Sequence, residues 1–334
     1  MEEENNLSGI DDSYYDISSI KENTNWNDVY IQRGAYNHLS LISQYKYDCD
    51  RIHLYDNNYY ISKSAGSGVD IYIIDRGINT MHLDFTHVDK DNPLEKNGRM
   101  PTHGTRVASV AAGYYFGVAK NANIHMIATD MSIGSLLLAL KYIKEIRGIE
   151  PHKTIINMSF GTYDVDNYSI LKDVIDDLVA SGFMFIASAG NNKVDSCTIR
   201  SIGDEEIFQE DYLSAKSSHI YSVATFSNYG SCTDIFAPGY VYAAYFPEEY
   251  IKNYDDSKIS NGYMYAYGTS YSAPIVAGIA ATLISENEDK KKFNQYELKK
   301  ELIELSQKDI IGDNFGLNKD RLKDTPNRFV NNGK

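Results

Sequence analysis

Residues 69–74, Val-Asp-Ile-Tyr-Ile-Ile, decide the fold, and Asp75 follows them directly. The run is short, mostly apolar and rich in β-branched residues, which favours a buried β-strand. Four later runs share this character, and they span residues 124–128, 154–158, 183–187 and 220–224. Short strands that are apolar on both sides are typical of a parallel sheet covered by helices on both faces.

Helical patterns lie between these predicted strands. Apolar residues recur at helical spacing over residues 135–146 and again over 170–180, where Gly182 follows as a stop signal. Alternating strands and helices imply right-handed crossovers. We therefore expect an α/β fold with a doubly wound, mostly parallel central sheet and helices on both faces, in three αβα layers. Such sheets bind ligands beyond the carboxyl ends of their strands, so we expect chemistry there.

The overall composition excludes several classes of protein. The chain has 334 residues, of which 43% are hydrophobic, an ordinary globular composition with ample material for a core. It carries 32 Lys+Arg against 46 Asp+Glu, a formal net charge of −14. This acidic balance argues against nucleic acid and against an anionic membrane surface as partners. No stretch approaches the roughly 18 apolar residues that a membrane span needs.

The first residues and the cysteines leave alternatives open. Residues 1–25 are polar and acidic, and we expect them to form a flexible arm. They lack the basic and apolar regions of a signal peptide, so either the protein is made in the cytosol or the sequence begins downstream of a leader. Cys49, Cys197 and Cys232 form no metal-binding motif, and the sequence does not say which two of them would pair.

Four polar residues stand where chemistry is expected, and each also has a simpler structural interpretation. Asp75 ends the first strand and could be a turn or cap residue. His103 opens a run of small apolar residues and could be a capping or core histidine. Asn191 follows a buried strand and could belong to an ordinary turn. Ser270 precedes an apolar helix with Pro274 in its first turns, and it could be an N-cap.

Their surroundings suggest chemical roles as well. A helix N-terminus disfavours a charged imidazole, so a charged His103 needs a carboxylate partner. The Asn191 amide can donate to an oxygen in the crevice. Backbone N–H groups at the helix start beside Ser270 would stabilise a nearby oxyanion.

Taken together, the order Asp, His, Asn, Ser and its flanking residues resemble the subtilisin-like serine proteases (subtilases, peptidase S8), and most closely the proteinase K branch. The blocks that carry the resemblance are 74–78 (IDRGI), 103–108 (HGTRVA), 156–159 (INMS), 189–191 (AGN), 226–239 (FSNYGSCTDIFAPG), 268–274 (GTSYSAP) and 325–327 (TPN). Trp26 resembles the start of a mature enzyme of that branch. The resemblance covers roughly residues 25 to 330 and implies the subtilisin-like form of the fold predicted above.

The resemblance implies a serine endopeptidase that acts through an acyl-enzyme. Ser270 would be the nucleophile, His103 the general base and then acid, and Asp75 the residue that orients His103. Asn191 and the backbone N–H of Ser270 would form the oxyanion hole.

The resemblance also implies where an extended substrate would lie. Two strand-like edges would pair with it, formed by Met131, Ser132, Ile133 and Gly134 and by Ser159, Phe160 and Gly161. Ala189 and Gly190 would complete the P1 pocket with Phe160 and Gly161. We expect broad cleavage after large hydrophobic residues.

Several residues depart from the family pattern. Arg76 follows the catalytic aspartate in place of a small hydroxyl residue and could compete with His103 for Asp75. Arg106 and Ser109 replace the His and Gly expected in the histidine block, and Tyr271 and Ser272 replace the Met and Ala expected after the nucleophile. The segment 130–134 looks shortened, and Leu213-Ser214 stands where a Tyr-Pro-Ala type of turn is expected.

No cofactor is expected for catalysis, and no catalytic metal. Asp234 matches a calcium-ligating carboxylate of the proteinase K branch, whose shell would be completed by carbonyls near Ser218 and Ile220. Such a calcium would be structural. The alternative is an ordinary loop carboxylate.

The remaining expectations concern organisation, partners and rival functions. We expect one catalytic domain over residues 26–330, a short tail over 331–334, a monomer, and polypeptide substrates. The resemblance implies an extracellular protein if the sequence is truncated at its N-terminus. The rival function is a weak or inactive peptide-binding or scaffold protein on the same fold, motivated by Arg76, Tyr271 and the unusual loops. A dehydrogenase is discarded because the nearby Gly66-Ser67-Gly68 precedes the first strand instead of following it.

Overall fold

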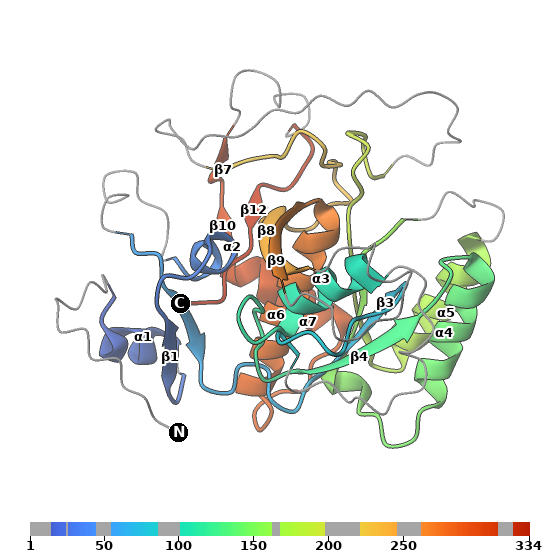
Figure 1. The fold of residues 1–334 in the computed structure, drawn as a ribbon, viewed down its shortest axis with the longest axis horizontal. Helices are drawn as coiled ribbons and strands as arrows, with labels where there is room; N and C mark the ends of the chain where they lie inside the picture. Colours follow the sequence, from blue (N-terminus) through green and yellow to red (C-terminus); the bar gives the residue numbers. More distant parts are fainter. Residues whose placement is uncertain are drawn as a thin grey trace.

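A computed structural model describes residues 15–24, 26–44, 55–85, 101–161, 168–197, 221–245, 262–312 and 323–334. Figure 1 shows a central sheet with helices on both sides of it. The helices are α1 (Ile17–Thr24), α2 (Asn37–Ser40), η1 (Leu41–Ser43), α3 (Pro101–Ala112), α4 (Ile133–Glu145), η4 (Pro151–Lys153), α5 (Tyr168–Ala180), α6 (Thr269–Glu286) and α7 (Gln295–Leu305). The strands are β1 (Val29–Gln32), β2 (Tyr59–Ser62), β3 (Asp70–Asp75), β4 (Asn123–Ala128), β5 (Thr154–Met158), β6 (Met184–Ala187), β7 (Tyr221–Ser222), β8 (Tyr240–Tyr245), β9 (Gly262–Tyr267), β10 (Gln307–Lys308), β11 (Ile311–Gly312) and β12 (Arg328–Phe329).

Within the described residues, the central sheet has four strands in the order β4-β3-β5-β6, and every neighbouring pair is parallel. These are four of the five strands predicted from the sequence. Because the strands are parallel, their carboxyl ends meet at one edge of the sheet, where Asp75 is the last residue of β3. The predicted doubly wound sheet is therefore confirmed.

Side chains of β3 alternate between the two faces of the sheet. Ile71 and Ile73 belong to the larger apolar cluster, which includes residues of α3 and α6. Tyr72 and Ile74 belong to a second cluster with residues of α4 and α5. Figure 1 shows α4 and α5 together on one side of the sheet and α3 and α6 on the other, so the three-layer αβα architecture is confirmed.

The fifth predicted strand behaves differently. Of its described residues, 221–224, only Tyr221 and Ser222 form a strand, and this strand, β7, pairs with β11 instead of joining the central sheet. The side chain of Gln295, at the start of α7, explains this difference. Its Oε1 accepts the Phe185 N–H at 2.7 Å and its Nε2 donates to the Phe185 carbonyl at 3.1 Å, so the amide occupies backbone groups at the outer edge of β6.

Helices α4 and α5 match the predicted spans closely, and Gly182 follows α5 with a φ of 101°. The apolar helix α6 starts earlier than expected, at Thr269. Pro274 is the sixth helical residue and lies within the first two turns, as predicted. Its missing N–H would otherwise bond the carbonyl of Ser270, so this proline interrupts the helical ladder beside the candidate nucleophile.

One terminal prediction needs correction. Residues 15–24 are not a flexible arm, because they include α1, whose Ile20 packs with Trp26 in a small apolar cluster. The tail over residues 331–334 packs against the rest of the chain. The side-chain amides of Asn331 and Asn332 donate to the carbonyls of Gln44 and Tyr60, both at 2.7 Å, and both asparagines are buried. Residues 1–14 lie outside the described residues.

Within the described part of the chain, we find no helix with the length and apolar character needed to cross a bilayer.

Candidate active site

Asp75 lies buried at the carboxyl end of β3, with both carboxylate oxygens engaged. Its Oδ1 accepts the backbone N–H of Arg76 at 2.7 Å, and its Oδ2 lies 2.7 Å from Nδ1 of His103. The Asp75 side chain is 2% exposed, whereas that of His103 is 39% exposed. The structure thus places the imidazole between a buried carboxylate and solvent, and the possible competition from Arg76 does not displace His103.

The position of His103 follows from the way α3 begins. His103 is the third residue of the helix, and from this position its imidazole reaches Asp75 at the carboxyl end of β3. Gly104 allows the helix start to approach β3, because a Cβ there would lie 2.2 Å from the Gly77 carbonyl oxygen. With Nδ1–H donating to Asp75, a neutral His103 carries its free lone pair on Nε2.

Ser109, a departure from the family pattern, ties α3 to its surroundings. Its hydroxyl donates to Oδ2 of buried Asp84 at 2.5 Å and accepts the N–H of Ala244 at 3.0 Å. Burial raises the pKa of Asp84, and the Ser109 hydrogen bond acts in the opposite direction. The Ser109 side chain therefore links the loop after β3, helix α3 and strand β8. Ser109 lies six residues after His103 on the same helix.

Ser270 is the second residue of α6, and Gly268 is the N-cap with a φ of 139°, which favours glycine. The first N–H groups of a helix have no intrahelical partner. Here the N–H of Thr269 is bound by Asn191, and that of Tyr271 donates to the Gly268 carbonyl at 3.0 Å. The Ser270 N–H lies between them at a helix N-terminus, where it can donate to an anion.

Asn191 comes from the loop after β6 and is fixed by Thr269. Its Oδ1 accepts both the N–H and the hydroxyl of Thr269, each at 2.9 Å, and the same hydroxyl oxygen accepts the Gly190 N–H at 3.1 Å. This arrangement assigns the amide orientation and leaves Nδ2 as the donor. The Nδ2 atom lies 3.4 Å from the place where a Cβ on Gly268 would stand, beside the start of α6.

The side chain of Asn228 fixes the backbone of the same loop. Its Nδ2 donates to the Ala189 carbonyl at 2.9 Å, and its Oδ1 accepts the N–H groups of Asn192 and Val194 at 2.9 and 3.2 Å. Such a bridge fixes the backbone on both sides of Asn191.

The contacts around Ser270 bring the four sequence-predicted residues into one region. Thr269, immediately before Ser270, binds Asn191. Tyr271, immediately after it, has its ring centroid 5.9 Å from that of His103, which in turn contacts Asp75. Among the described residues no hydrogen bond joins the Ser270 hydroxyl to His103. Catalytic hydrogen bonds are often long in unliganded sites, so the missing bond does not by itself exclude a serine–histidine pair.

One of the two segments that we expected to pair with substrate does not have a strand-like conformation. Met131 and Ser132 precede α4, while Ile133 and Gly134 lie in its first turn, so residues 131–134 form no strand-like edge. The cause is local capping: the Asp130 carboxylate accepts the N–H and hydroxyl of Ser132, and Ser132 caps the Ser135 N–H at 3.3 Å.

The second edge lies beside the loop of Asn191. The Ser188 N–H donates to the Met158 carbonyl at 3.1 Å, so residues 158–161 run next to Ala189 and Gly190. Ser159 is buried and its hydroxyl accepts a hydrogen bond from Asn157 at 2.8 Å, so only its backbone is available to a ligand. Phe160 is partly buried against the second apolar cluster, and Gly161 is exposed.

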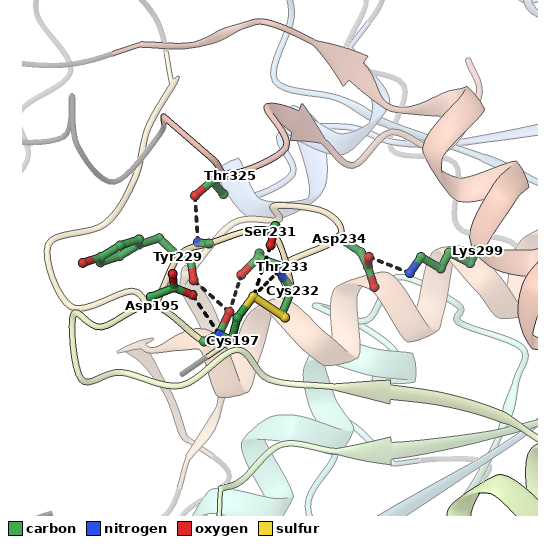
Figure 2. The surroundings of a disulfide bond; sticks show 11 residues. Asp195, Cys197, Tyr229, Ser231, Cys232, Thr233, Asp234, Lys299 and Thr325 are labelled. Carbon is green, nitrogen blue, oxygen red and sulfur yellow. Dashed lines mark hydrogen bonds and ion pairs between the residues drawn. A yellow bond between two sulfur atoms is a disulfide. The ribbon is translucent and has the colours of Figure 1, made fainter. Parts of the chain in front are cut away.

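Asp234, the expected calcium ligand, forms an ion pair with a lysine. Its Oδ1 lies 2.7 Å from Nζ of Lys299 (Figure 2), and the structural calcium stays a prediction. Ser218 and Ile220, whose region would supply carbonyl ligands, lie outside the described residues, as do Leu213 and Ser214. Among the described residues, no group of three or more His, Cys, Asp or Glu is arranged to hold a metal.

A disulfide joins Cys197 to Cys232, with a Cα–Cα distance of 5.3 Å, and Figure 2 shows its surroundings. Cys49 lies outside the described residues. Next to the disulfide, the Ser196 N–H donates to the Tyr229 carbonyl at 2.7 Å, and Thr325 accepts the Gly230 N–H at 2.7 Å. The disulfide therefore reinforces an attachment that backbone hydrogen bonds also make.

Sequence reasoning missed several residues that organise this region. Thr269 and Asn228 fix the Asn191 loop, and both lie inside blocks that carried the family resemblance. A hydroxyl residue directly before the candidate nucleophile was the available signal for Thr269. For the interaction of Arg106 with Tyr271, the sequence offered only two separate departures from the pattern.

Residues 66–328 match the sequence profile of the Subtilase family. The chain belongs to the subtilase family. Among curated relatives, it is 29% identical to the "Subtilisin-like serine protease pepC" of Aspergillus niger over 77% of this chain and 50% of that protein. It is 28% identical to the "Subtilase-type proteinase RRT12" of Saccharomyces cerevisiae over 96% of this chain and 63% of that protein. This subtilase thus spans only about half to three fifths of the length of these relatives.

A solved structure supports the fold. This subtilase superposes on the chain described as "Crystal structure of a cold adapted subtilisin-like serine proteinase" with a TM-score of 0.66 and 24% identity. The match covers 90% of this chain and 98% of that one, so it extends beyond the residues that the family profile matches. The specific relation to the proteinase K branch stays a prediction.

Proposed function

We propose that this subtilase is a serine endopeptidase that hydrolyses peptide bonds through an acyl-enzyme. The observation that carries the proposal is the contact of 2.7 Å between Nδ1 of His103 and the buried Asp75 carboxylate, beside the helix start that bears Ser270. A histidine held in this way presents Nε2 as a base. The printed names of the curated relatives point to the same chemistry.

In the proposed reaction, Ser270 Oγ attacks the carbonyl carbon of the scissile peptide while His103 Nε2 takes the hydroxyl proton. Asp75 stabilises the resulting imidazolium, which then gives the proton to the leaving amine. Water repeats the sequence on the acyl-enzyme: His103 removes its proton, the acid product leaves, and Ser270 is regenerated.

The developing negative charge on the carbonyl oxygen would be met by two donors. The Asn191 Nδ2 is free for this role because Oδ1 is the atom that Thr269 binds. The Ser270 N–H is the second donor, reinforced by the N-terminal end of the α6 dipole. Both donors are fixed before substrate arrives, which is what makes such a site effective.

The substrate would be an extended polypeptide that pairs with the backbone of residues 159–161. Phe160, Gly161, Ala189 and Gly190 would line the P1 pocket, and we propose a broad preference for large hydrophobic P1 residues. Because α4 starts at Ile133, the opposite edge offers no strand for pairing. Substrate recognition should therefore depend on the 159–161 edge more than on residues 131–134.

The rival function, an inactive peptide-binding protein, rested on interference with the triad by Arg76 and Tyr271. The Arg76 backbone binds the Asp75 oxygen that His103 does not use, and Tyr271 packs beside the imidazole without breaking its contact with Asp75. The geometry supports the enzyme over this alternative.

The test compares two serines of the same helix. Ser270→Ala should reduce hydrolysis of casein and of hydrophobic peptides at least 10³-fold, since only binding and the oxyanion donors remain. Ser272→Ala is the matched control: the Ser272 hydroxyl donates to the carbonyls of Ala237 and Pro238, both at 3.2 Å, and its loss should change activity less than threefold. Equal activity of wild type and Ser270→Ala, or a folded wild type that cleaves no peptide in a diverse library, would refute the proposal.

A further inference from the structure

Two departures from the family pattern, distant in sequence, meet beside the candidate catalytic histidine. Arg106 lies on α3, three residues after His103, and Tyr271 lies on α6, directly after Ser270. The Arg106 guanidinium acts on the Tyr271 hydroxyl, in the direction opposite to the burial that raises the pKa of this phenol. The Tyr271 ring lies against His103 with centroids 5.9 Å apart and planes inclined by 42°.

Tyr271 is buried, so its interaction with Arg106 affects how the ring is held. The side chain is nearly inaccessible, with 4% of the residue exposed. Burial raises the pKa of Tyr271, with the Arg106 guanidinium acting in the opposite direction, so the phenol stays protonated at neutral pH. Because the guanidinium favours a position next to the phenol oxygen, this interaction restrains the outer end of the ring.

Arg106 is itself held in one orientation. Its Cζ lies 5.0 Å from the centroid of the Tyr245 ring at the end of β8, a cation–π distance. Its Nε is buried without a hydrogen-bond partner among the described residues, and the Tyr271 hydroxyl is a polar group on which the guanidinium acts. Arg106 of α3 therefore restrains the hydroxyl end of the Tyr271 ring, and helix α6 fixes the backbone of Tyr271.

The imidazole of His103 needs such a support, because its side chain is 39% exposed and one hydrogen bond to Asp75 does not by itself prevent rotation. Rotation of the His103 imidazole toward α6 would have to displace the Tyr271 ring, which is restrained at its hydroxyl and at its backbone. A ring of the same shape without the Arg106 contact would offer less resistance.

We propose that Arg106 and Tyr271 form a positioning pair that holds the His103 imidazole against Asp75 and in line with Ser270. The inference rests on the proposed function for its kinetic consequence, but its structural part concerns only the orientation of His103. Neither residue touches the reacting atoms.

The test is a double-mutant cycle with Tyr271→Phe, Arg106→Met and the combined variant. Each single change should lower kcat about tenfold with KM within twofold, because positioning and not substrate binding is lost. The double variant should lose about tenfold and not a hundredfold, because both changes remove the same contact. Tyr245→Phe is the matched control: it deletes a phenol hydroxyl from the other ring beside Arg106 but keeps that ring, and kcat should stay within twofold.

Proton NMR of the histidine Nδ1–H provides a readout that needs no turnover. Wild type and Tyr245→Phe should show a downfield His103 resonance from the bond to Asp75, and Tyr271→Phe and Arg106→Met should broaden or lose it. Unchanged resonances in the single variants, additive losses in kcat, or a lower melting temperature with unchanged kcat would each overturn the inference. A wild type without turnover whose resonance is still lost in Tyr271→Phe would refute the proposed function and support the positioning pair.

Discussion

Gly104 offers the sharpest test of how α3 places His103. In Gly104→Ala, the new Cβ would lie 2.2 Å from the Gly77 carbonyl oxygen and 3.1 Å from Cβ of Asp75. Real Cβ contacts hardly ever fall below 3.0 Å, so the helix start and the loop after β3 must part by about 0.8 Å. The Nδ1–Oδ2 distance of 2.7 Å would then approach about 3.5 Å, the limit of a hydrogen bond.

A misplacement of about 1 Å in a catalytic group costs up to 10²-fold in rate, so kcat should fall between about 10- and 10²-fold. Overpacking should also destabilise the fold by about 1–3 kcal/mol. The assay is peptide hydrolysis normalised to active sites titrated with an acylating ester, which removes the unfolded fraction from the comparison.

Gly278→Ala is the control for overpacking itself. Its Cβ would lie 2.5 Å from Val118 Cβ and 2.8 Å from the Ala111 carbonyl, at the far end of α3. We expect a similar loss of unfolding free energy but a kcat within threefold of wild type. If Gly104→Ala, fully folded by titration, keeps wild-type kcat, then the close approach of α3 to β3 does not set the geometry of His103.

Three further predictions follow from single contacts. Asn191→Ala should lower kcat about 10²–10³-fold with little change in KM, a magnitude known from a member of the same family, and a loss below threefold would remove Asn191 from the oxyanion hole. Replacing Cys197 and Cys232 by serine should lower the unfolding free energy by up to about 4 kcal/mol, from loop closure over a separation of 35 residues, while kcat per folded molecule stays within threefold. Burial lowers the pKa of His38 from 6.5 to about 4, so the unfolded state binds the proton first and stability falls as pH drops below 6.5. Between pH 7 and 5 the loss should be about 2 kcal/mol in urea titrations, and His38→Gln should remove it; an identical pH dependence in that variant would contradict the assignment.

The sequence predicted the parts of the fold that short-range patterns control. The run at residues 69–74 has the β-branched, two-sided apolar character of a buried strand, and Gly182 marks a helix end through its positive φ. The sequence could not show that the fifth strand stays off the edge of β6, because the backbone groups at that edge are bound by Gln295, 110 residues away in the sequence. The buried C-terminal residues were missed for the same reason, since Asn331 and Asn332 look polar and find their partners only in the folded chain.

The candidate site divides in a similar way. Asp75 and His103 could be named from their flanking residues, and the structure places them in contact. The early start of α4 was hidden because an Asp-x-Ser segment permits a loop as well as a cap, and only the bonds to Ser132 and Ser135 distinguish the two. A contact between side chains on two different helices, such as that of Arg106 with Tyr271, requires the packing of α3 on α6 and has no signature in one sequence.

The central claim is that one hydroxyl of this chain is activated by a histidine that a buried carboxylate orients. Its most direct measurement is the position of the covalent adduct formed with a fluorophosphonate, located by peptide mass spectrometry. The account predicts one adduct per molecule, on Ser270, forming at least 10²-fold more slowly in His103→Ala than in wild type, given that a positioned general base contributes about 10²–10⁴-fold. An adduct on another residue, or Ser270 labelling that is equally fast without His103, would contradict it.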